Sequence, residues 1–222
     1  QAAEDQAVRF IEKDSRIDVL IDGTHVTSYR YSGDLTKPVL YPVKTLSGVA
    51  LNRGFPIAPR EGESKDHHHH LGIFFTYDEV NESGFWNNTT SPPQIKHVKT
   101  VQAEGGEGKG TLSTVMEWVD KDRTPILEEK RTMVFHPGKD AYGIDFTMDL
   151  TAKAKVEFGD TKEGMFAIRT ADWFRENTGN TRYIASTGKT GAGDIWGTRA
   201  AWVALQGKKP EMEEAVGIAI MN

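Results

Sequence analysis

The sequence predicts an all-β protein: an antiparallel β-sandwich of two packed sheets, with about ten or more strands and one or two short helices. Apolar residues alternate with polar ones along many short segments, which is the period of a strand with one buried face. Helical periodicity is scarce. Because no repeat and no Pro- or Ser-rich linker divides the 222 residues, we expect a single domain over residues 1–222.

The first elements are expected near the N-terminus. Residues 4–13 carry a weak helical pattern. Residues 17–21 and 24–29 read as strands that flank Asp22-Gly23. This pair tolerates positive φ at both positions, which favours the tight turn of a β-hairpin.

Three longer strands are expected in the middle of the chain. A period of two runs through Leu112, Thr114, Met116 and Trp118 and through Leu127, Glu129, Arg131, Met133 and Phe135, and residues 142–150 place an apolar side chain at every second position. The turn-like residues 120–123 join the first two of these strands into a hairpin. Further strands are expected at residues 39–43, 72–77, 95–103, 156–158, 165–169, 182–185, 200–205 and 216–221, and a second short helix at residues 171–176.

Charge and composition exclude several classes of protein. Lys and Arg number 27 against 32 Asp and Glu, and no basic stripe is present, so we expect no nucleic-acid partner. No apolar run approaches the ~20 residues of a membrane-spanning helix, so no membrane span is expected. The absence of cysteine excludes disulfides, thiolate metal sites and a cysteine nucleophile.

The N-terminus bears on location. The chain begins Gln1-Ala2-Ala3, as a mature exported protein would after removal of a signal peptide. We therefore expect a periplasmic or extracellular protein, although a trimmed chain would begin in the same way.

Four consecutive histidines form the strongest candidate site. They follow Asp66 and lead into a strand-like segment, so the run is not a terminal tag. In an extended segment His67 and His69 would share one face, where both could reach one metal ion or one substrate. Imidazole is also well suited to proton transfer near neutral pH. The alternatives are a loop of solvated histidines, or histidines hydrogen-bonded in the core.

Asp66, His67, His69 and His70 make up the predicted catalytic set, in which the histidines would act as acids, bases or metal ligands. Asp66 could accept an imidazole N–H and so fix the tautomer, or it could be an ordinary turn carboxylate. Any cofactor would be a divalent metal held by histidines, with His67 and His69 as the first candidates. Nitrogen ligands suit zinc, iron or copper better than calcium.

Five further residues are candidates for substrate binding. Trp86 and Trp196 stand in Asn- or Gly-rich settings, where an aromatic face could contact a sugar; core packing is the alternative. Glu129, Arg131 and Arg169 lie on strand-like stretches whose alternate positions are apolar. Inward-facing charges there would need pairing, so a Glu129–Arg131 cluster that lines a cleft is one interpretation and an exposed ladder is the other.

The histidine motif also carries a resemblance. Residues 66–74 read Asp-His-His-His-His-Leu-Gly-Ile-Phe and are followed by Val80-Asn81 and Phe85-Trp86. They resemble the bacterial "methane oxygenase PmoA-like" family, whose pattern runs Asp-His-x-His-His-x-Gly, then Val-Asn-Gly and Phe-Trp. Further matches follow in the family's order at residues 129–132, 144–146, 166–169, 196–197, 201–202 and 217–220.

The resemblance covers nearly the whole chain from about Pro38. His68 stands where the family often has Pro, Ala204 where an Asp is expected, and Glu82-Ser83 where a glycine turn is expected. Family members usually continue beyond Asn222 with a His-Pro-containing segment and a final strand, so we expect a domain without that C-terminal segment. The resemblance implies a β-sandwich, often exported, in a genomic setting of glycan breakdown.

The motif and the resemblance together predict an exported carbohydrate-active enzyme that uses acid/base or metal-assisted chemistry on a glycan or sugar. The reaction would be hydrolysis, elimination of water or epimerisation, and the expected ligand is a carbohydrate. Two alternatives stay open: a non-catalytic glycan-binding module, and a metal-dependent oxygenase as the family name suggests.

Overall fold

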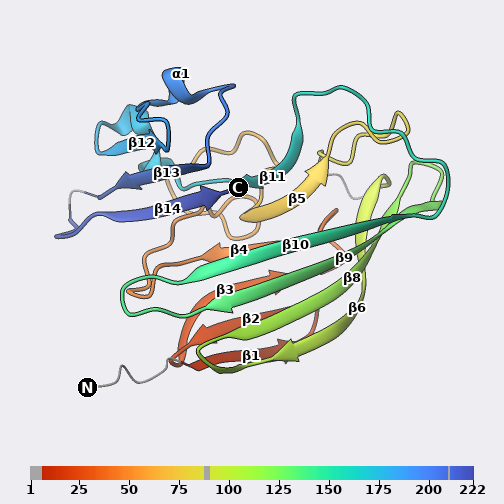
Figure 1. Cartoon of the computed structure of the whole chain (residues 1–222), viewed down its shortest axis with the longest axis horizontal. Helices are drawn as coiled ribbons and strands as arrows, with labels where there is room; N and C mark the ends of the chain where they lie inside the picture. Colours follow the sequence, from red (N-terminus) through yellow and green to blue (C-terminus); the bar gives the residue numbers. More distant parts are fainter. Residues whose placement is uncertain (1–6, 88–90, 210) are drawn as a thin grey trace.

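The computed structural model describes residues 7–87, 91–209 and 211–222. It has antiparallel sheets of seven, four and three strands, and the first two pack face to face as a sandwich (Figure 1). The predicted all-β class is therefore confirmed. Among the described residues, no helix is long and apolar enough to cross a membrane.

The seven-stranded sheet comes mostly from the N-terminal part of the chain, and neighbouring strands pair in antiparallel fashion. From edge to edge it runs β11 (Gly164–Ile168), β5 (Ile73–Tyr77), β4 (Val39–Val43), β3 (Thr24–Arg30), β2 (Arg16–Ile21), β1 (Ala7–Lys13) and β7 (Gly106–Glu107).

The four-stranded sheet comes from the middle of the chain and carries the long alternating segments. Its order is β10 (Gly143–Ala152), β9 (Pro125–His136), β8 (Gly110–Val119) and β6 (Gln94–Glu104).

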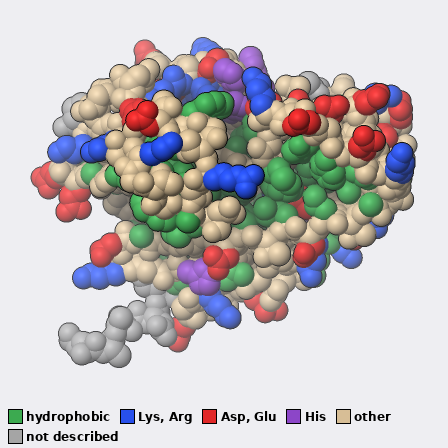
Figure 2. All heavy atoms as spheres, turned by 45° about the horizontal axis from the view of Figure 1, so that its top comes forward, with side chains coloured by type: hydrophobic (Ala, Val, Ile, Leu, Met, Phe, Trp, Pro, Cys, Tyr) green, Lys and Arg blue, Asp and Glu red, His purple; other side chains and the backbone are tan. Residues whose placement is uncertain are grey.

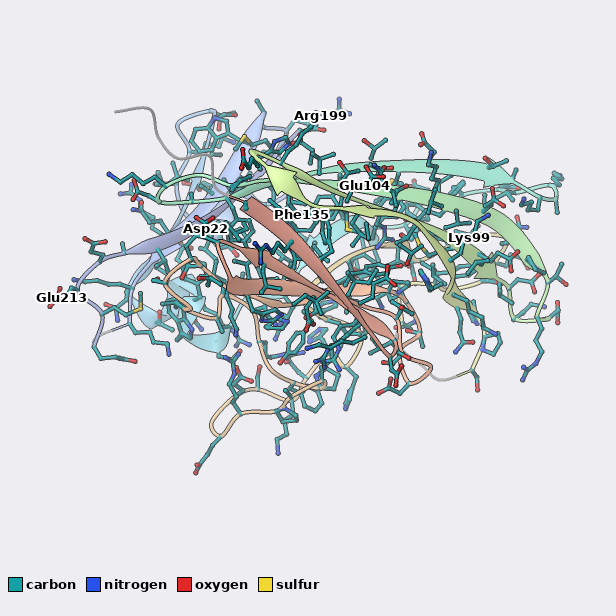
Figure 3. The ribbon with its side chains drawn as sticks, turned by 90° about the horizontal axis from the view of Figure 1, so that it is seen from below. Asp22, Lys99, Glu104, Phe135, Arg199 and Glu213 are labelled. Carbon is teal, nitrogen blue, oxygen red and sulfur yellow. The ribbon has the colours of Figure 1, made fainter. Side chains whose placement is uncertain are left out.

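Alternate side chains of these two sheets meet in the main core. Ile17 and Val19 of β2 pack in one cluster with Leu112 of β8 and with Met133 and Phe135 of β9, all fully buried. Figure 3 shows Phe135 between the two sheets. The alternation predicted for β8 and β9 is confirmed, because every second residue from Leu112 to Trp118 and from Leu127 to Phe135 is buried.

The three-stranded sheet is smaller and comes from the C-terminal part of the chain. Leu205 packs with Leu51 and Phe174, so an apolar cluster separate from the main core joins this sheet to the sandwich. Its strands are β12 (Thr181–Ala185), β13 (Trp202–Gly207) and β14 (Val216–Met221), and helix α1 (Ala192–Ile195) lies between β12 and β13 in sequence.

The hairpin predicted at Asp22-Gly23 is confirmed. It joins β2 to β3, with Ile21 paired to Thr24. The φ angles are +48° at Asp22 and +77° at Gly23. Two successive positive φ angles belong to a type I′ turn, whose twist matches that of the flanking strands.

The helix predicted for residues 4–13 is wrong over the part that the structure describes, and residues 4–6 lie outside the described residues. Residues 7–13 form strand β1. Val8 and Phe10 alternate into the main core, and β2 supplies a pairing partner along the whole strand. Tertiary pairing therefore outweighs a weak local helical pattern.

Two further local predictions are corrected. Residues 171–176 do not form one helix but contribute to two 3₁₀ turns, η1 (Asp172–Phe174) and η2 (Glu176–Thr178). Residues 156–158 form no strand, since Phe158 makes only a single bridge, to Val80.

Gly72 determines how β5 begins. Its φ is +48°, and a Cβ atom at this position would lie 2.1 Å from the backbone oxygen of Leu40. Glycine alone avoids both the strained φ and the clash. The strand predicted from residue 72 therefore starts at Ile73, which pairs with Leu40 of β4, and the residues before it turn away from the sheet.

Candidate functional site

The four histidines lie in a tight turn before β5. His67 has a φ of +44°, and the backbone N–H of His70 donates to the carbonyl oxygen of His67 at 3.0 Å. The prediction that His67 and His69 share the face of an extended strand is therefore wrong, because the positive φ closes the segment into a turn. Residues 67–70 are called the histidine turn below.

Three of the four rings come together in the histidine turn. The rings of His67 and His70 are stacked, with centroids 4.9 Å apart and planes at 18°. The His69 ring lies 5.7 Å from that of His67 and 4.4 Å from that of His70. His68 packs instead against Phe55 at 4.9 Å. In the space-filling view, histidine side chains gather at the upper edge of the molecule beside Lys and Arg (Figure 2).

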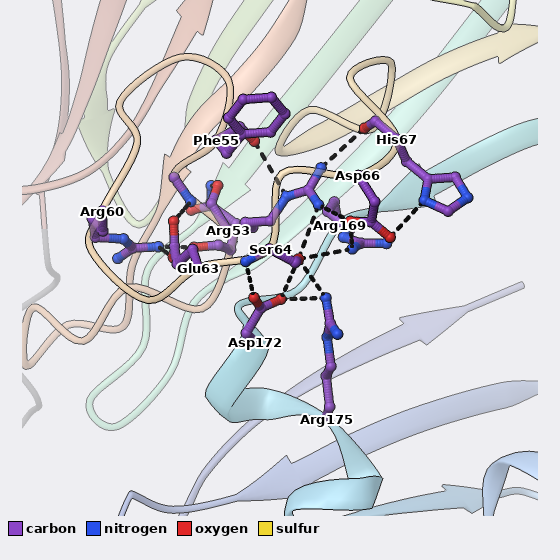
Figure 4. A network of polar contacts seen from close by, with 12 residues as sticks. Arg53, Phe55, Arg60, Glu63, Ser64, Asp66, His67, Arg169, Asp172 and Arg175 are labelled. Carbon is purple, nitrogen blue, oxygen red and sulfur yellow. Dashed lines mark hydrogen bonds and ion pairs between the residues drawn. The ribbon is translucent and has the colours of Figure 1, made fainter.

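Asp66 is held at the head of the histidine turn by two arginines (Figure 4). Nη1 of Arg53 and Nη2 of Arg169 both donate to Oδ1 of Asp66, at 2.5 Å and 2.8 Å. The other carboxylate oxygen, Oδ2, lies 2.7 Å from Nδ1 of His67. The structure thus joins Asp66 and His67 as a dyad and places the predicted residue Arg169 behind it.

Arg53 also fixes the backbone of the turn. Its side chain is 0% exposed, and its Nη2 donates to the carbonyl oxygen of His67 at 2.9 Å. Its Nη1 reaches Oγ of Ser64 at 3.2 Å, and its Nε donates to the carbonyl oxygen of Phe55 at 3.3 Å. One buried guanidinium therefore organises the segment between Phe55 and His67.

Ser64 connects this segment to η1. Its backbone N–H donates to Asp172, and its hydroxyl donates to Oδ1 of the same carboxylate at 2.9 Å. Arg175 donates to Oγ of Ser64 at 2.8 Å and forms an ion pair with Asp172. Segments about 100 residues apart in the chain, the first before β5 and the second after β11, therefore support the dyad together (Figure 4).

Asp66 is ionised in this setting. Burial acts to raise its pKa, but the hydrogen bond from His67, the charge of Arg169 and the hydrogen bond from Arg53 outweigh burial and hold the pKa well below its usual range. An ionised carboxylate only accepts hydrogen bonds, so Nδ1 of His67 carries a proton and donates it to Oδ2 of Asp66. The His67 side chain is 52% exposed, which leaves the ring open to a substrate.

His69 and His70 are neutral imidazoles at neutral pH. Burial lowers the pKa of His69, and the charge of Lys37 lowers it further. Burial, followed by the charges of His69 and His67, lowers the pKa of His70 to about 3. Lys37 is itself buried, which lowers its pKa to about 7, and its Nζ donates to the carbonyl oxygen of Trp86 at 3.0 Å.

We expect acid to destabilise the protein through His70. Its folded pKa of about 3 lies below the 6.5 of an unfolded histidine, so the unfolded state binds more protons between these values and stability falls as pH falls through that window. His70→Gln should reduce this loss by on the order of 2 kcal/mol at pH 4, allowing for partial exposure. Urea unfolding at pH 7 and pH 4 measures it. His68→Gln, in the same turn, is the control and should lose as much unfolding free energy between pH 7 and pH 4 as the wild type. An equal loss in His70→Gln would contradict the expectation.

Trp86 forms a wall of the site. Its side chain is buried and lies edge-on to the rings of His70, at 5.7 Å, and Phe74, at 5.2 Å. Neither Nε1 of Trp86 nor Nε2 of His70 has a hydrogen-bond partner among the described residues. The predicted residue Trp86 therefore contacts the histidine turn, but it offers no exposed face on which a sugar could stack.

Glu129 and Arg131 lie elsewhere, inside the sandwich. Glu129 is 0% exposed and accepts hydrogen bonds from Nε1 of Trp118 at 2.8 Å and from Nε of Arg131 at 2.7 Å. The pairing expected of inward-facing charges is present. The prediction that Glu129 and Arg131 line an open cleft is wrong, because both side chains are buried between the two packed sheets.

Trp196 also lies outside the dyad network. It follows helix α1 in the smaller C-terminal region, and its side chain is 84% exposed. Of the predicted substrate-binding residues, Arg169 and Trp86 are the ones that the structure brings to the histidine turn, as far as the described residues show.

The donor set does not fit a metal centre. Among residues 7–87, 91–209 and 211–222, no group of three or more His, Asp or Glu side chains is arranged to hold a metal ion. Nδ1 of His67 is engaged by Asp66, and the unpartnered Nε2 of His70 is buried.

Several supporting residues gave little signal in the sequence. Arg53, Ser64 and Asp172 lie in segments without alternation or a known motif. Lys37 stands between the apolar Leu35 and Val39. A charged residue that alternates with apolar ones indicates a buried side chain with a hydrogen-bond partner, and this weak signal could have identified Lys37.

A family model covers both the sandwich and the dyad, since residues 16–222 match DUF6807, a family of unknown function. The chain belongs to this family. The DUF6807 match includes the histidine turn and η1, but it assigns no activity and does not support the methane oxygenase name that the motif suggested. No curated protein and no solved structure matches this chain.

Proposed function

We propose that this protein is an exported carbohydrate-active enzyme in which the Asp66–His67 dyad transfers a proton to or from a sugar. The observation that carries the proposal is the 2.7 Å contact between Oδ2 of Asp66 and Nδ1 of His67. Asp66 orients the ring and stabilises the imidazolium that forms when Nε2 takes a proton. Arg53 and Arg169 keep the carboxylate ionised, so the dyad is ready to act as a base.

The surroundings of the dyad favour a polyhydroxylated substrate. The side chains of Asp66 and His67 are 49% and 52% exposed, and that of Arg169 is partly exposed. Hydroxyl groups can donate to the carboxylate and to the imidazole and can accept from the guanidinium. Hydrolysis, elimination of water and epimerisation each need a proton donor as well as a proton acceptor, and the ring of His69, 5.7 Å from that of His67, is the neighbouring imidazole that can take the second role.

Substitution of the dyad tests the proposal. His67→Ala and Asp66→Asn should each lower kcat/KM on a responsive oligosaccharide by at least about 100-fold, since each removes the oriented base. His68→Ala is the matched control, because its ring turns to Phe55, and it should stay within about twofold of wild type. A screen of oligosaccharides with product detection supplies the assay. Full activity in His67→Ala contradicts the dyad mechanism.

A second candidate is a non-catalytic glycan-binding module. It is favoured by the exposed indole of Trp196, since an aromatic face open to solvent can stack on a sugar. Saturable oligosaccharide binding that Trp196→Ala abolishes, with no turnover by the wild-type protein, would support the module in place of the enzyme.

A further inference from the structure

A second polar site lies on the outer face of β1, β2 and β3, which run side by side (Figure 1). Lys13, Arg16 and Arg30 alternate with residues that face the main core. The strand register places Lys13 directly opposite Arg16, and Arg16 directly opposite Arg30. Three cationic side chains therefore form one row across three strands.

The three cations of this row are not fully balanced by neighbouring carboxylates. Like charges directly opposite each other in a sheet are destabilising. The carboxylate of Asp18 lies 2.6 Å from Nζ of Lys13 and 3.1 Å from Nε of Arg16. Among the described residues, Arg30 has no ion pair; its guanidinium lies 5.9 Å from the ring centroid of Tyr41. One carboxylate thus stands against three cations.

The same side chains line a cleft of about 380 Å³, which lies within the usual size range of small-ligand sites. Ile11 and Leu20 supply apolar walls, and Tyr41 supplies an aromatic one. His25 and Ser28 add polar groups, with Nε2 of His25 at 2.9 Å from Oγ of Ser28. The cleft therefore combines an excess of positive charge with apolar surface for an organic group.

We propose that this cleft binds a compact oxyanion, the carboxylate, sulfate or phosphate group of a small organic ligand, with Arg16 and Arg30 as its principal partners. Each guanidinium presents a planar fork of N–H donors that matches an oxyanion. An anion between the two arginines replaces their repulsion by two attractive contacts. The apolar walls and Tyr41 contact the remainder of the ligand. This site shares no residue with the dyad, so it stands independently of the proposed function.

Sodium sulfate tests the charge requirement at constant ionic strength. It should raise the melting temperature of the wild-type protein in a saturable way. Arg30→Gln removes the repulsion with Arg16, so its melting temperature without sulfate should equal or exceed that of wild type, while its sulfate affinity falls about tenfold or more. Arg182→Gln removes the same charge from an exposed position on β12 and should keep wild-type affinity, measured by isothermal titration calorimetry.

Three sugars identify the source of the oxyanion. Binding of D-glucuronate that Arg30→Gln weakens assigns a carboxylate, and the same result with D-glucose 6-phosphate assigns a phosphate. Equal binding of D-glucose overturns the proposal. So does the absence of saturable sulfate binding by the wild type, or an equal sulfate affinity in Arg30→Gln. A lowered melting temperature in Arg30→Gln with the sulfate response intact also overturns it, because Arg30 is then structural.

Discussion

Replacing Arg53 with Met should lower the free energy of unfolding by about 3–5 kcal/mol. The Met side chain keeps part of the buried stem but removes a fully buried guanidinium. The carbonyl oxygen of Phe55 then loses this donor, that of His67 keeps only the backbone N–H of His70, and Asp66 keeps only one of its two arginines. The expected loss combines the hydrogen bonds that the buried guanidinium made with the space that it leaves in the interior.

Urea unfolding measures the free energy of unfolding of Arg53→Met and of two control variants. Arg182→Met removes an exposed arginine and should change stability by no more than about 0.5 kcal/mol. Arg53→Lys keeps the charge, but an ammonium cannot reproduce the fork that reaches Phe55, Ser64 and His67, so its stability should be intermediate. A stability of Arg53→Met equal to that of Arg182→Met would show that Arg53 does not organise the turn.

Replacing Glu129 with Gln should also cost about 3–5 kcal/mol. Glu129 is fully enclosed, and Oε1 lies 2.7 Å from both Nε and Nη2 of Arg131. The neutral Gln leaves the charge of Arg131 buried without a counter-charge. Thermal and urea unfolding report the loss. If Glu129 bound substrate instead, activity would fall while stability held.

A double substitution separates charge from packing at this pair. Glu129→Met with Arg131→Met removes both charges together, so the double variant should be more stable than either single variant. Some cost should persist, because Nε1 of Trp118 loses its acceptor. A double variant that is less stable than both singles contradicts a charge-driven loss.

The fold was largely predictable because its signals are local. Alternation in β8, β9 and β10 depends on each strand burying one face, and that pattern can be read within ten residues or so. The Asp22-Gly23 turn is equally local. Strand β1 was mispredicted because its identity depends on pairing with β2, which a short window does not contain. The prediction of one helix at residues 171–176 failed for a similar reason. The 3₁₀ turns found there lie where Phe174 packs with Leu51 and Leu205, which are distant in sequence.

The site was predictable only in part. The motif located Asp66 and the histidines, but it implied an extended chain, since neither the positive φ of His67 nor its cause is visible in the motif. Arg53 and Asp172 act through contacts that span up to 108 residues of sequence. No periodicity links such positions. Glu129 and Arg131 matched the pattern of cleft residues, yet a core ion pair has the same alternating pattern.

The close approach at Gly72 has a consequence for how this family can diverge. The atom that a side chain would meet is the backbone oxygen of Leu40, 2.1 Å away, so no substitution at a neighbouring side chain can make room. Mutational drift at Gly72 is therefore blocked as long as β4 keeps its course. A relative with any other residue at this position must have rebuilt the turn into β5, and its histidines would have a different arrangement from those of this chain.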